Sequence, residues 1–345
     1  DQYYNFAGWW IGSPYIVKLP SGKLIAAHDV FGEENNVEIL FSSEDNGKTW
    51  QYLTEMANFW TSKLFVNNGK LYILGSGNST WGIGIAESSD EGKTWTEPVT
   101  LIRKMHNKSQ IYKGYGNIVN NTPIVSHNGR LYTVFETGGW SRWSDDAYDC
   151  HMLSAPCDSN LLDINSWEYT PGCNFDHSGF DIPDADFLTA IEGNAMVGPD
   201  GEIYSLSRMD AVYGPVKKGV RTELFDVALL YKLKNFDEPM EYLGPVSAKV
   251  GNRHMFCVHK DDVSNKYIMI HNEETLATLG RRNMLSLSVS EDILHWEKKA
   301  TLLDVRNAPG ESTVSQPSFV FVDDDLLFLS RTSWGRMYNQ HNANM

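Results

Sequence analysis

Long apolar runs, paired cysteines and helical periodicity are all missing from this 345-residue chain. No stretch of about 18 consecutive apolar residues occurs, so the sequence predicts no membrane-spanning helix. No Cys-x-x-Cys pair occurs either, which leaves a zinc site without support. Three of the four cysteines, Cys150, Cys157 and Cys173, share one segment with room for one disulfide. No helix-length segment repeats apolar residues every 3.6 positions, which favours an all-β fold.

Positive charge is also scarce. Lys and Arg number 29 against 44 Asp and Glu, which gives a formal net charge of −15. This balance predicts no nucleic-acid partner, because phosphates need a basic surface. An anionic sugar is compatible with it only where arginines gather locally. Hydrophobic residues make up 41% of the chain, enough for a core. We expect residues 1–345 to form a single domain, because a repeated all-β array reaches this size as one unit.

An eight-residue pattern, Ser-x-Asp-x-Gly-x-Thr-Trp, occurs at residues 43–50 and again at 88–95. Its Asp can accept hydrogen bonds from the N–H groups of a tight turn, and its Gly supplies a positive φ. Less regular copies follow at residues 158–167 and 290–296. A period of roughly 40–50 residues is typical of propeller blades. The pattern resembles the Asp box of sialidase-like β-propellers, and we interpret its Asp residues as structural rather than catalytic.

Six hairpins recur along the chain, each an apolar run, a polar turn and a second apolar run. They cover residues 13–29, 62–75, 122–136, 192–208, 255–272 and 316–331. Asn-Gly and Asp-Gly turns between apolar runs are strong hairpin signals. Most hairpins are followed by a third strand and then by a fourth that a Trp opens, and four strands make a blade. The sequence therefore predicts a β-propeller of six four-stranded blades, with seven open, and with residues 3–10 completing the last blade.

Polar groups end the second strand of each predicted hairpin. They are His28-Asp29, Gly75-Ser76, Glu136, Arg208, His271-Asn272-Glu273 and Arg331. In a propeller these strand ends converge on one concavity, so they are the default candidates for a functional site.

The residue types at these positions indicate acid–base chemistry on an acidic ligand. His28 can act as acid or base near neutral pH, or can be a structural His at a strand end. Arg208 and Arg331 occupy matching repeat positions, and a guanidinium binds a carboxylate in a bidentate manner. Their alternative role is ion pairing between blades. Arg282 adds positive charge nearby, and Glu136 is a candidate acid, base or arginine partner.

A second resemblance rests on short motifs spread from one end of the chain to the other. They are Gly12-Ser13-Pro14, Ala27-His28-Asp29, Asn128-Gly129-Arg130-Leu131-Tyr132, Leu153-Ser154-Ala155-Pro156, Glu192-Gly193-Asn194, Arg282-Asn283 and His341-Asn342-Ala343-Asn344. Together they look like the propellers of glycoside hydrolase family 145, which remove α-L-rhamnose linked to glucuronic acid, as in arabinogalactan. The resemblance implies that His28 matches the family's proposed catalytic His. Relatives with Gln there lack activity.

There are three alternatives to this hydrolase: a polysaccharide lyase, a non-catalytic glycan-binding propeller and a sialidase. The related rhamnose–uronate and ulvan lyases use a base, an acid and a carboxylate-neutralising Arg. They have a His where this chain has Asn in residues 114–121, although Tyr115 could serve as acid. A non-catalytic glycan-binding propeller is also open. A sialidase is disfavoured, because residues 13–16 lack the family's Arg-Ile-Pro motif and no nucleophilic Tyr is evident around Tyr338.

The sequence thus predicts an exported enzyme, secreted, periplasmic or at the cell surface, that acts on an acidic oligosaccharide or polysaccharide. Its predicted catalytic residues are His28 and Glu136. Its predicted substrate-binding residues are Arg208, Arg331, Arg282, His271 and Tyr115. No metal or cofactor is predicted from ligand spacing, and a structural cation in the central channel is left open.

Overall fold

Antiparallel sheets account for nearly all regular structure in the computed structural model. The residues it describes are 10–31, 36–77, 82–103, 115–139, 148–173, 187–212, 227–248, 250, 254–273, 282–308 and 312–333. One short 3-10 helix, η1 (Ile164–Ser166), is the only helical element in these ranges. No helix in them is long and apolar enough to cross a membrane.

Successive strands of the chain form successive sheets. The first sheet contains β1 (Trp10–Lys18), β2 (Leu24–Phe31), β3 (Val37–Ser43) and β4 (Gln51–Ala57). The second contains β5 (Phe59–Asn67), β6 (Lys70–Gly77), β7 (Ile83–Ser88) and β8 (Val99–Ile102). The third contains β9 (Tyr115–Ile118) and β10 (Val125–His127), both paired with β11 (Arg130–Gly139), then β12 (Asp149–Pro156) and β13 (Glu168–Tyr169).

The later sheets repeat this order. The fourth contains β14 (Phe187–Val197), β15 (Ile203–Val212), β16 (Val227–Lys232) and β17 (Glu241–Ser247). The fifth contains β18 (Phe256–Asp261), β19 (Lys266–Asn272), β20 (Met284–Ser290) and β21 (Glu297–Asp304). The last contains β22 (Thr313–Val322) and β23 (Asp325–Ser333).

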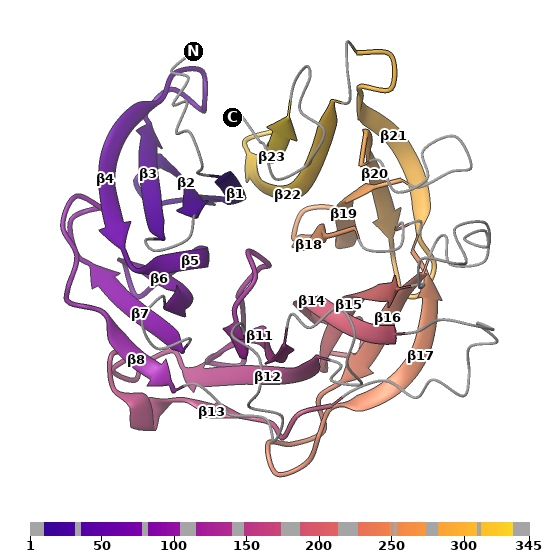
Figure 1. Ribbon diagram of the computed structural model, residues 1–345, viewed down its shortest axis with the longest axis horizontal. Coiled ribbons are helices and arrows are strands. Elements are labelled where there is room, and N and C mark those ends of the chain that lie inside the picture. The colour runs from indigo at the N-terminus through magenta and orange to yellow at the C-terminus, as the bar shows by residue number, and fades with distance from the viewer. Residues whose placement is uncertain are drawn as a thin grey trace.

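The sheets stand around a ring, as the blades of a propeller (Figure 1). The first strand of each blade lies nearest the centre, and the fourth lies on the rim. β22 packs beside β1, so the last sheet lies next to the first. The predicted all-β propeller with four-stranded blades is therefore confirmed.

The predicted blade count of six is not confirmed. Five sheets contain four or more paired strands, whereas the sixth consists of β22 and β23 alone among the described residues. The predicted completion of the last blade by residues 3–10 lies outside the described residues, apart from Trp10, which begins β1 and pairs with Phe31 of the first blade.

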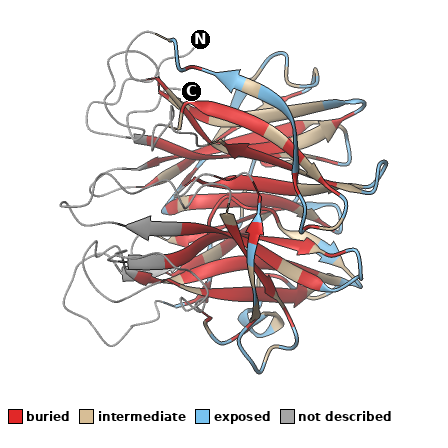
Figure 2. Cartoon of the chain, turned by 90° about the vertical axis from the view of Figure 1, so that its right-hand side faces the viewer, coloured by how far each residue is buried: buried red, intermediate tan, exposed pale blue. Residues whose placement is uncertain are grey.

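The hydrophobic core is divided into layers between neighbouring blades. Ile25 and Leu40 of the first blade pack with Leu64 and Ile73 of the second, and comparable clusters fill each following junction. Figure 2 shows the buried strands stacked through the molecule. Each sheet is therefore apolar on both faces. This explains the nearly continuous apolar runs that mark the hairpins in the sequence.

A one-residue bulge interrupts four of the innermost strands at the same place. The register shifts lie between Gly12 and Tyr15, Trp60 and Lys63, Ile191 and Asn194, and Ser315 and Ser318. Each bulge holds a non-glycine residue with positive φ, namely Ser13, Thr61, Glu192 and Gln316. In the third blade the inner strand is split into β9 and β10 instead. Bulges of this kind redirect side chains and often lie beside functional sites.

The Asp-box prediction is confirmed in detail. Asp45 accepts hydrogen bonds from Thr49 N at 2.8 Å and Thr49 Oγ1 at 2.6 Å. Gly47 has a φ of 82°, and Trp50 Nε1 donates to its carbonyl at 3.1 Å. The box at residues 88–95 makes the same contacts. These boxes join the third and fourth strands of a blade, far from the strands that line the centre.

The one disulfide for which the cysteine-containing segment has room is not formed. Cys150, Cys157 and Cys173 are all free thiols. Cys150 and Cys173 lie on neighbouring backbone segments that exchange hydrogen bonds, yet each sulfur points to a carbonyl, Ala190 O at 3.6 Å and Cys150 O at 3.2 Å respectively. Packing against a carbonyl, rather than cross-linking, determines where these side chains lie.

We predict that Gly193→Ala in the β14 bulge lowers the free energy of unfolding by about 1–3 kcal/mol, because overpacking a filled site forces side chains apart. A Cβ there would lie 2.7 Å from both Ser205 Oγ and Val134 Cγ1. Gly84→Ala is the matched control, since its nearest neighbour would be Val99 O at 3.7 Å. Urea unfolding of both variants measures the difference, and equal stabilities would contradict the tight packing of the bulge.

Candidate functional site

One structural position recurs at the end of the second strand of every hairpin. In four blades the residue at this position pairs with the last inner-strand residue before the bulge. The pairs are Asp29 with Gly12, Ser76 with Trp60, Arg208 with Ile191, and Arg331 with Ser315. Glu136 opposite Ile118, and Asn272 one residue past the paired His271, fill the same place in the third and fifth blades. We call Asp29, Ser76, Glu136, Arg208, Asn272 and Arg331 the polar ring. All six are at most 8% exposed.

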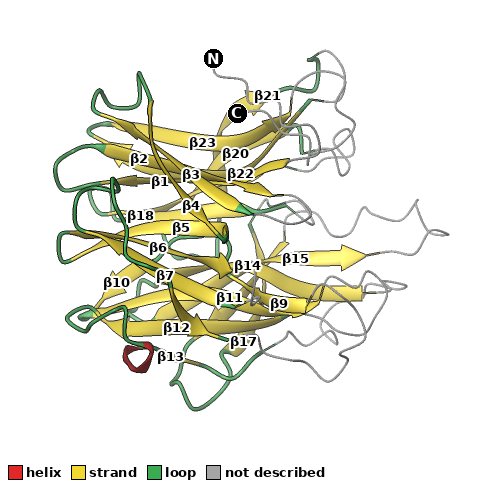
Figure 3. Ribbon diagram, turned by 60° about the vertical axis from the view of Figure 1, so that its left-hand side comes forward, coloured by secondary structure: helices red, strands yellow, loops and turns green. Residues whose placement is uncertain are grey.

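The polar ring and the Asp boxes lie at opposite faces of the propeller. In a blade that contains an Asp box, the second strand runs away from the turn that joins it to the first, and the third strand runs back to the Asp-box turn. The turns at that face are drawn in Figure 3. The strand order therefore places the second-strand ends at the face opposite the Asp boxes, and the predicted convergence of these ends on one concavity stays a prediction.

Four ring residues hold the backbone of the next blade. Asp29 Oδ2 accepts from Thr61 N at 2.9 Å, and Ser76 Oγ accepts from Val119 N at 3.1 Å. Glu136 Oε1 accepts from Gly193 N at 3.0 Å, and the amide of Asn272 donates to Val314 O at 2.7 Å. Two of these bonds, to Thr61 N and Gly193 N, satisfy backbone groups within the inner-strand bulges. We call the four bonds the inter-blade brackets.

The two ring arginines bond to side chains of their own blades. Arg208 forms a 2.6 Å ion pair with Glu192, and Arg331 donates to Gln316 Oε1 at 3.3 Å. Both partners are the positive-φ residues of their bulges. Burial lowers the pKa of Arg331 to about 10, while the negative charge of Asp29 opposes the shift, so the guanidinium is charged at neutral pH.

Arg282 and Arg208 act on one imidazole. His254, 1% exposed, lies directly before the inner strand of the fifth blade. Burial holds its pKa well below the ordinary value, and the positive charges of Arg282 and Arg208 lower it further. Arg282 also has a positive φ of 43°, and its carbonyl accepts from Val314 N at 2.8 Å. The charges of Arg208 and Arg282, from the fourth and fifth blades, therefore both reach the imidazole of His254.

His28 lies beside the ring on the opposite face of β2 from Asp29. It is 4% exposed and stacks on Phe41, with ring centroids 5.7 Å apart. Its Nδ1 lies 3.3 Å from Asp29 O. Burial lowers the pKa of His28 to about 4. The imidazole is thus neutral at pH 7, a state in which it can accept a proton.

His271 is built into the fold. It is fully buried, and its Nε2 lies 2.8 Å from Ser288 Oγ. The predicted binding residue Tyr115 begins β9 opposite Gly139, and its side chain lies outside the described residues. The motif at residues 341–344 and Tyr338 also lie outside them.

Sequence reasoning missed a buried lysine beside Glu136. Lys63 is fully buried and donates to Thr122 Oγ1 at 3.1 Å and Thr133 Oγ1 at 2.8 Å. Burial lowers the pKa of Lys63 and raises that of Glu136, and each group's charge partly offsets the other's shift. Glu136 also accepts from Asn120 at 2.5 Å. The sequence feature that could have indicated this buried charge is a lysine within the apolar run of residues 62–66.

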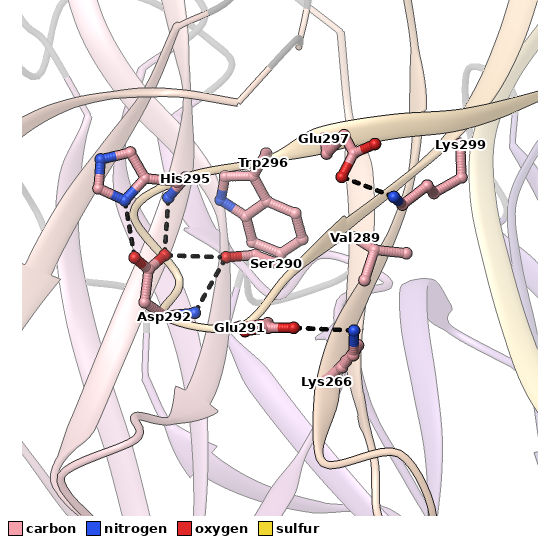
Figure 4. A pocket seen from close by; sticks show the side chains of 9 residues that line it. All are labelled: Lys266, Val289, Ser290, Glu291, Asp292, His295, Trp296, Glu297 and Lys299. Atoms are coloured by element: carbon pink, nitrogen blue, oxygen red, sulfur yellow. Dashed lines mark hydrogen bonds and ion pairs between the residues drawn. The ribbon is translucent and has the colours of Figure 1, made fainter.

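A surface pocket of about 320 Å³ lies elsewhere, at the irregular Asp box of the fifth blade (Figure 4). Its charged groups are already paired with one another. Lys266 contacts Glu291 at 2.8 Å, and His295 contacts Asp292 at 2.7 Å. Trp296 Nε1 donates to Ile293 O, as in the regular boxes. The pocket is therefore formed by the hairpin turn itself, and the ionisable side chains named here already contact one another. The described residues contain no group of three or more His, Cys, Asp or Glu that could hold a metal ion.

Comparisons with known proteins agree on the fold. No family model and no curated protein matches the sequence. Solved structures do match. A protein of unknown function from Dyadobacter fermentans DSM 18053 aligns at a TM-score of 0.67 and 14% identity, covering 96% of this chain and 93% of that one.

Two enzymes of the same architecture also match. A GH93 α-L-arabinofuranosidase of Fusarium graminearum, complexed with arabinobiose, aligns at a TM-score of 0.61 and 11% sequence identity, covering 97% of this chain and 92% of that one. Trypanosoma rangeli sialidase aligns at a TM-score of 0.61 and 14% sequence identity, covering 97% of this chain and 54% of that one. The chain thus spans about half the length of this sialidase. At these identities the likeness establishes a sialidase-like β-propeller fold.

We predict that His28→Gln changes how stability depends on pH. Because the folded pKa of about 4 lies below the ordinary 6.5, the unfolded chain binds the proton first as the pH falls. The stability associated with neutral His28 is complete above pH 6.5 and is lost toward pH 4. Relative to the variant, the wild type should lose up to about 1.4 kcal/mol per pH unit across this window. If urea unfolding shows that wild type and His28→Gln lose the same stability as the pH falls from 6.5 to 4, the buried, neutral state of His28 is contradicted.

Proposed function

We propose that this protein is an exported carbohydrate-active enzyme that hydrolyses terminal α-L-rhamnose linked to glucuronic acid. The observation that supports the proposal is that the second strands end at one face of the propeller, where His28 lies beside Asp29 in the first blade and where Arg208 and Arg331 end the equivalent strands of two later blades. The fold likeness to glycosidases supports the general class. The rhamnosyl–glucuronate specificity rests on the motif resemblance around His28 and Arg282.

The arginines are the proposed site for the uronate carboxylate. Arg208, Arg282 and Arg331 come from the fourth, fifth and sixth sheets, and Arg208 and Arg282 lie within electrostatic reach of the same His254. A guanidinium fork matches a carboxylate in shape and charge. This local gathering of positive charge reconciles an acidic ligand with the chain's net charge of −15.

His28 is the proposed catalytic group. As a neutral imidazole it would accept a proton from the attacking water or a sugar hydroxyl and later return it. Glu136 we now propose as a positioning residue. Its carboxylate holds Gly193 N, next to the Glu192 that pairs with Arg208. The bracket would thereby fix where the Arg208 guanidinium points.

A β-eliminating lyase is the second candidate, and the neutral state of His28 favours it. A neutral imidazole can remove the proton on uronate C5, while the arginines neutralise the carboxylate so that the carbanion can form. A non-catalytic glycan-binding propeller is the third candidate. In all three candidate functions, the ligand binds at the face of the propeller where the second strands end.

Products separate the three. The protein is incubated with a rhamnose-capped glucuronide and with a ulvan-type polymer. We expect free rhamnose without new ultraviolet absorbance. An unsaturated uronate, seen as new absorbance, would instead establish the lyase, and binding without products would establish the glycan-binding protein.

Variants test the assigned residues. His28→Gln should abolish turnover while leaving the fold intact, and Arg208→Lys should raise KM at least tenfold, because a bidentate contact becomes a single one. His295→Gln is the matched control, since that imidazole lies 85% exposed on an outer hairpin and should leave kcat/KM unchanged. Wild-type turnover by His28→Gln would remove His28 from the mechanism.

A further inference from the structure

Two carboxyl groups meet inside the junction of the first and second blades. Asp29 of β2 and Glu38 of β3 are direct cross-strand partners, so their side chains project from the same face of the sheet. Both are 0% exposed. Their face is covered by β5, whose bulge residues Thr61 and Ser62 are also buried. This is a place where two negative charges would be costly.

The hydrogen-bond pattern at this junction is incomplete when both groups are taken as ionised. Asp29 Oδ2 accepts from Thr61 N at 2.9 Å. Asp29 Oδ1, both carboxyl oxygens of Glu38, and Ser62 Oγ are buried without a hydrogen bond of good geometry, although Ser62 lies near enough to act on Glu38, and Gly12 and Ser13 near enough to act on Asp29. Buried polar atoms are nearly always hydrogen-bonded. These four oxygens, in three neighbouring side chains, therefore indicate that a proton or a cation lies between the two carboxyl groups.

The surrounding charges allow only one of the two carboxyls to be ionised. Arg331 of β23 acts on Asp29. The groups facing the pair from β5 and β6 are Thr61, Ser62 and Ser76, those from β1 are Gly12 and Ser13, and all are neutral. Met56 lies opposite Glu38 on β4, and the buried Lys63 of β5 bonds instead to Thr122 and Thr133 of the third blade. Among the described residues, Arg331 is thus the positive charge that acts on the pair, through Asp29.

We propose that Glu38 and Asp29 form a buried proton-binding site, in which the carboxyl of Glu38 keeps its proton and donates it in a hydrogen bond to Asp29 Oδ1. The Ser62 hydroxyl then donates to the other oxygen of Glu38. A single proton satisfies all four oxygens and leaves one negative charge opposite Arg331. In agreement, burial raises the pKa of Glu38 well above its ordinary value, and the charge of Asp29 raises it further.

The site couples protonation to the geometry of the polar ring. Asp29 holds the bulge of the second blade through Thr61 N, and its carbonyl lies 3.3 Å from Nδ1 of His28. When Glu38 loses its proton, two negative charges share a dry junction and push β2 and β3 away from β5. The proton therefore keeps the first two blades together beside His28.

A cation is the competing occupant, since carboxylate and hydroxyl oxygens also suit Ca²⁺. Charge balance argues against it. With Arg331 present, a divalent ion and two carboxylates would leave a net positive charge in a buried junction, whereas the proton leaves none.

The test compares unfolding of the full chain in urea from pH 5 to pH 9 for wild type, Glu38→Gln and the control Glu55→Gln, an exposed residue of β4. Glutamine keeps the shape and the neutral donor but cannot ionise. Above the unfolded pKa of about 4.5, only the folded wild type retains the proton, so raising the pH destabilises it. The unfolding equilibrium constant of wild type relative to Glu38→Gln should rise up to tenfold per pH unit. The Glu55→Gln ratio should stay flat.

Two results would overturn the proposal. One is a flat ratio for Glu38→Gln, which means that Glu38 is ionised in the folded protein. The other is a wild-type midpoint that rises with added calcium chloride at constant ionic strength, while that of Glu38→Gln does not, which means that a cation occupies the site. If Glu38→Gln does not fold, infrared spectra of wild type and Ser62→Ala at pH 7 decide. The carbonyl band of a protonated carboxyl should be present and should shift in Ser62→Ala, and no shift would refute the hydrogen-bonded site.

Discussion

The propeller depends on bonds between one blade's second strand and the next blade's inner strand. The bulges of the inner strands break their own ladders and leave backbone groups unpaired in a dry interior. The inter-blade brackets supply the missing partners, from Asp29 to Thr61 and from Glu136 to Gly193. A hydrogen bond to a charged group contributes about 1.5–3 kcal/mol, and an unmade one costs a comparable amount. The brackets therefore fix the spacing of blades at the centre.

The same ring position carries two kinds of residue with different consequences. Asp29, Glu136 and Asn272 bond to backbone and cannot leave without opening a junction. Arg208 and Arg331 bond to the side chains of Glu192 and Gln316 within their own blades. Arg331 also acts electrostatically on Asp29 of the first blade. In the proposed site, the carboxylate of a ligand would compete for these guanidinium groups while the backbone bonds hold the blades in place.

Much of this architecture was predictable from the chain because it is local. The hairpins follow from apolar runs around Asn-Gly and Asp-Gly turns, and the Asp boxes follow from a turn that bonds within eight residues. The equivalence of Arg208 and Arg331 follows from counting along equivalent hairpins. The predicted count of six blades is not confirmed at the last blade, where only β22 and β23 are described.

The bulges and brackets were not predictable, because each joins residues of different blades. Nothing local indicates that Asp29 bonds to Thr61 or that Glu38 faces it across the sheet. Pro14 and Pro317, inside otherwise apolar inner strands, were the available signal, since proline within a strand marks a bulge. Lys63 and the free cysteines show the same limit. Their surroundings are set by neighbouring blades rather than by sequence neighbours.

We propose that ligand chemistry takes place at the face where the second strands end. A crystal structure with a bound rhamnosyl–glucuronate oligosaccharide is the most direct test. We expect the uronate carboxylate on the guanidinium groups of Arg208, Arg282 or Arg331, with the glycosidic oxygen toward His28. A sugar bound at the Asp-box face, or on the rim strands β4, β8, β17 or β21, would contradict it.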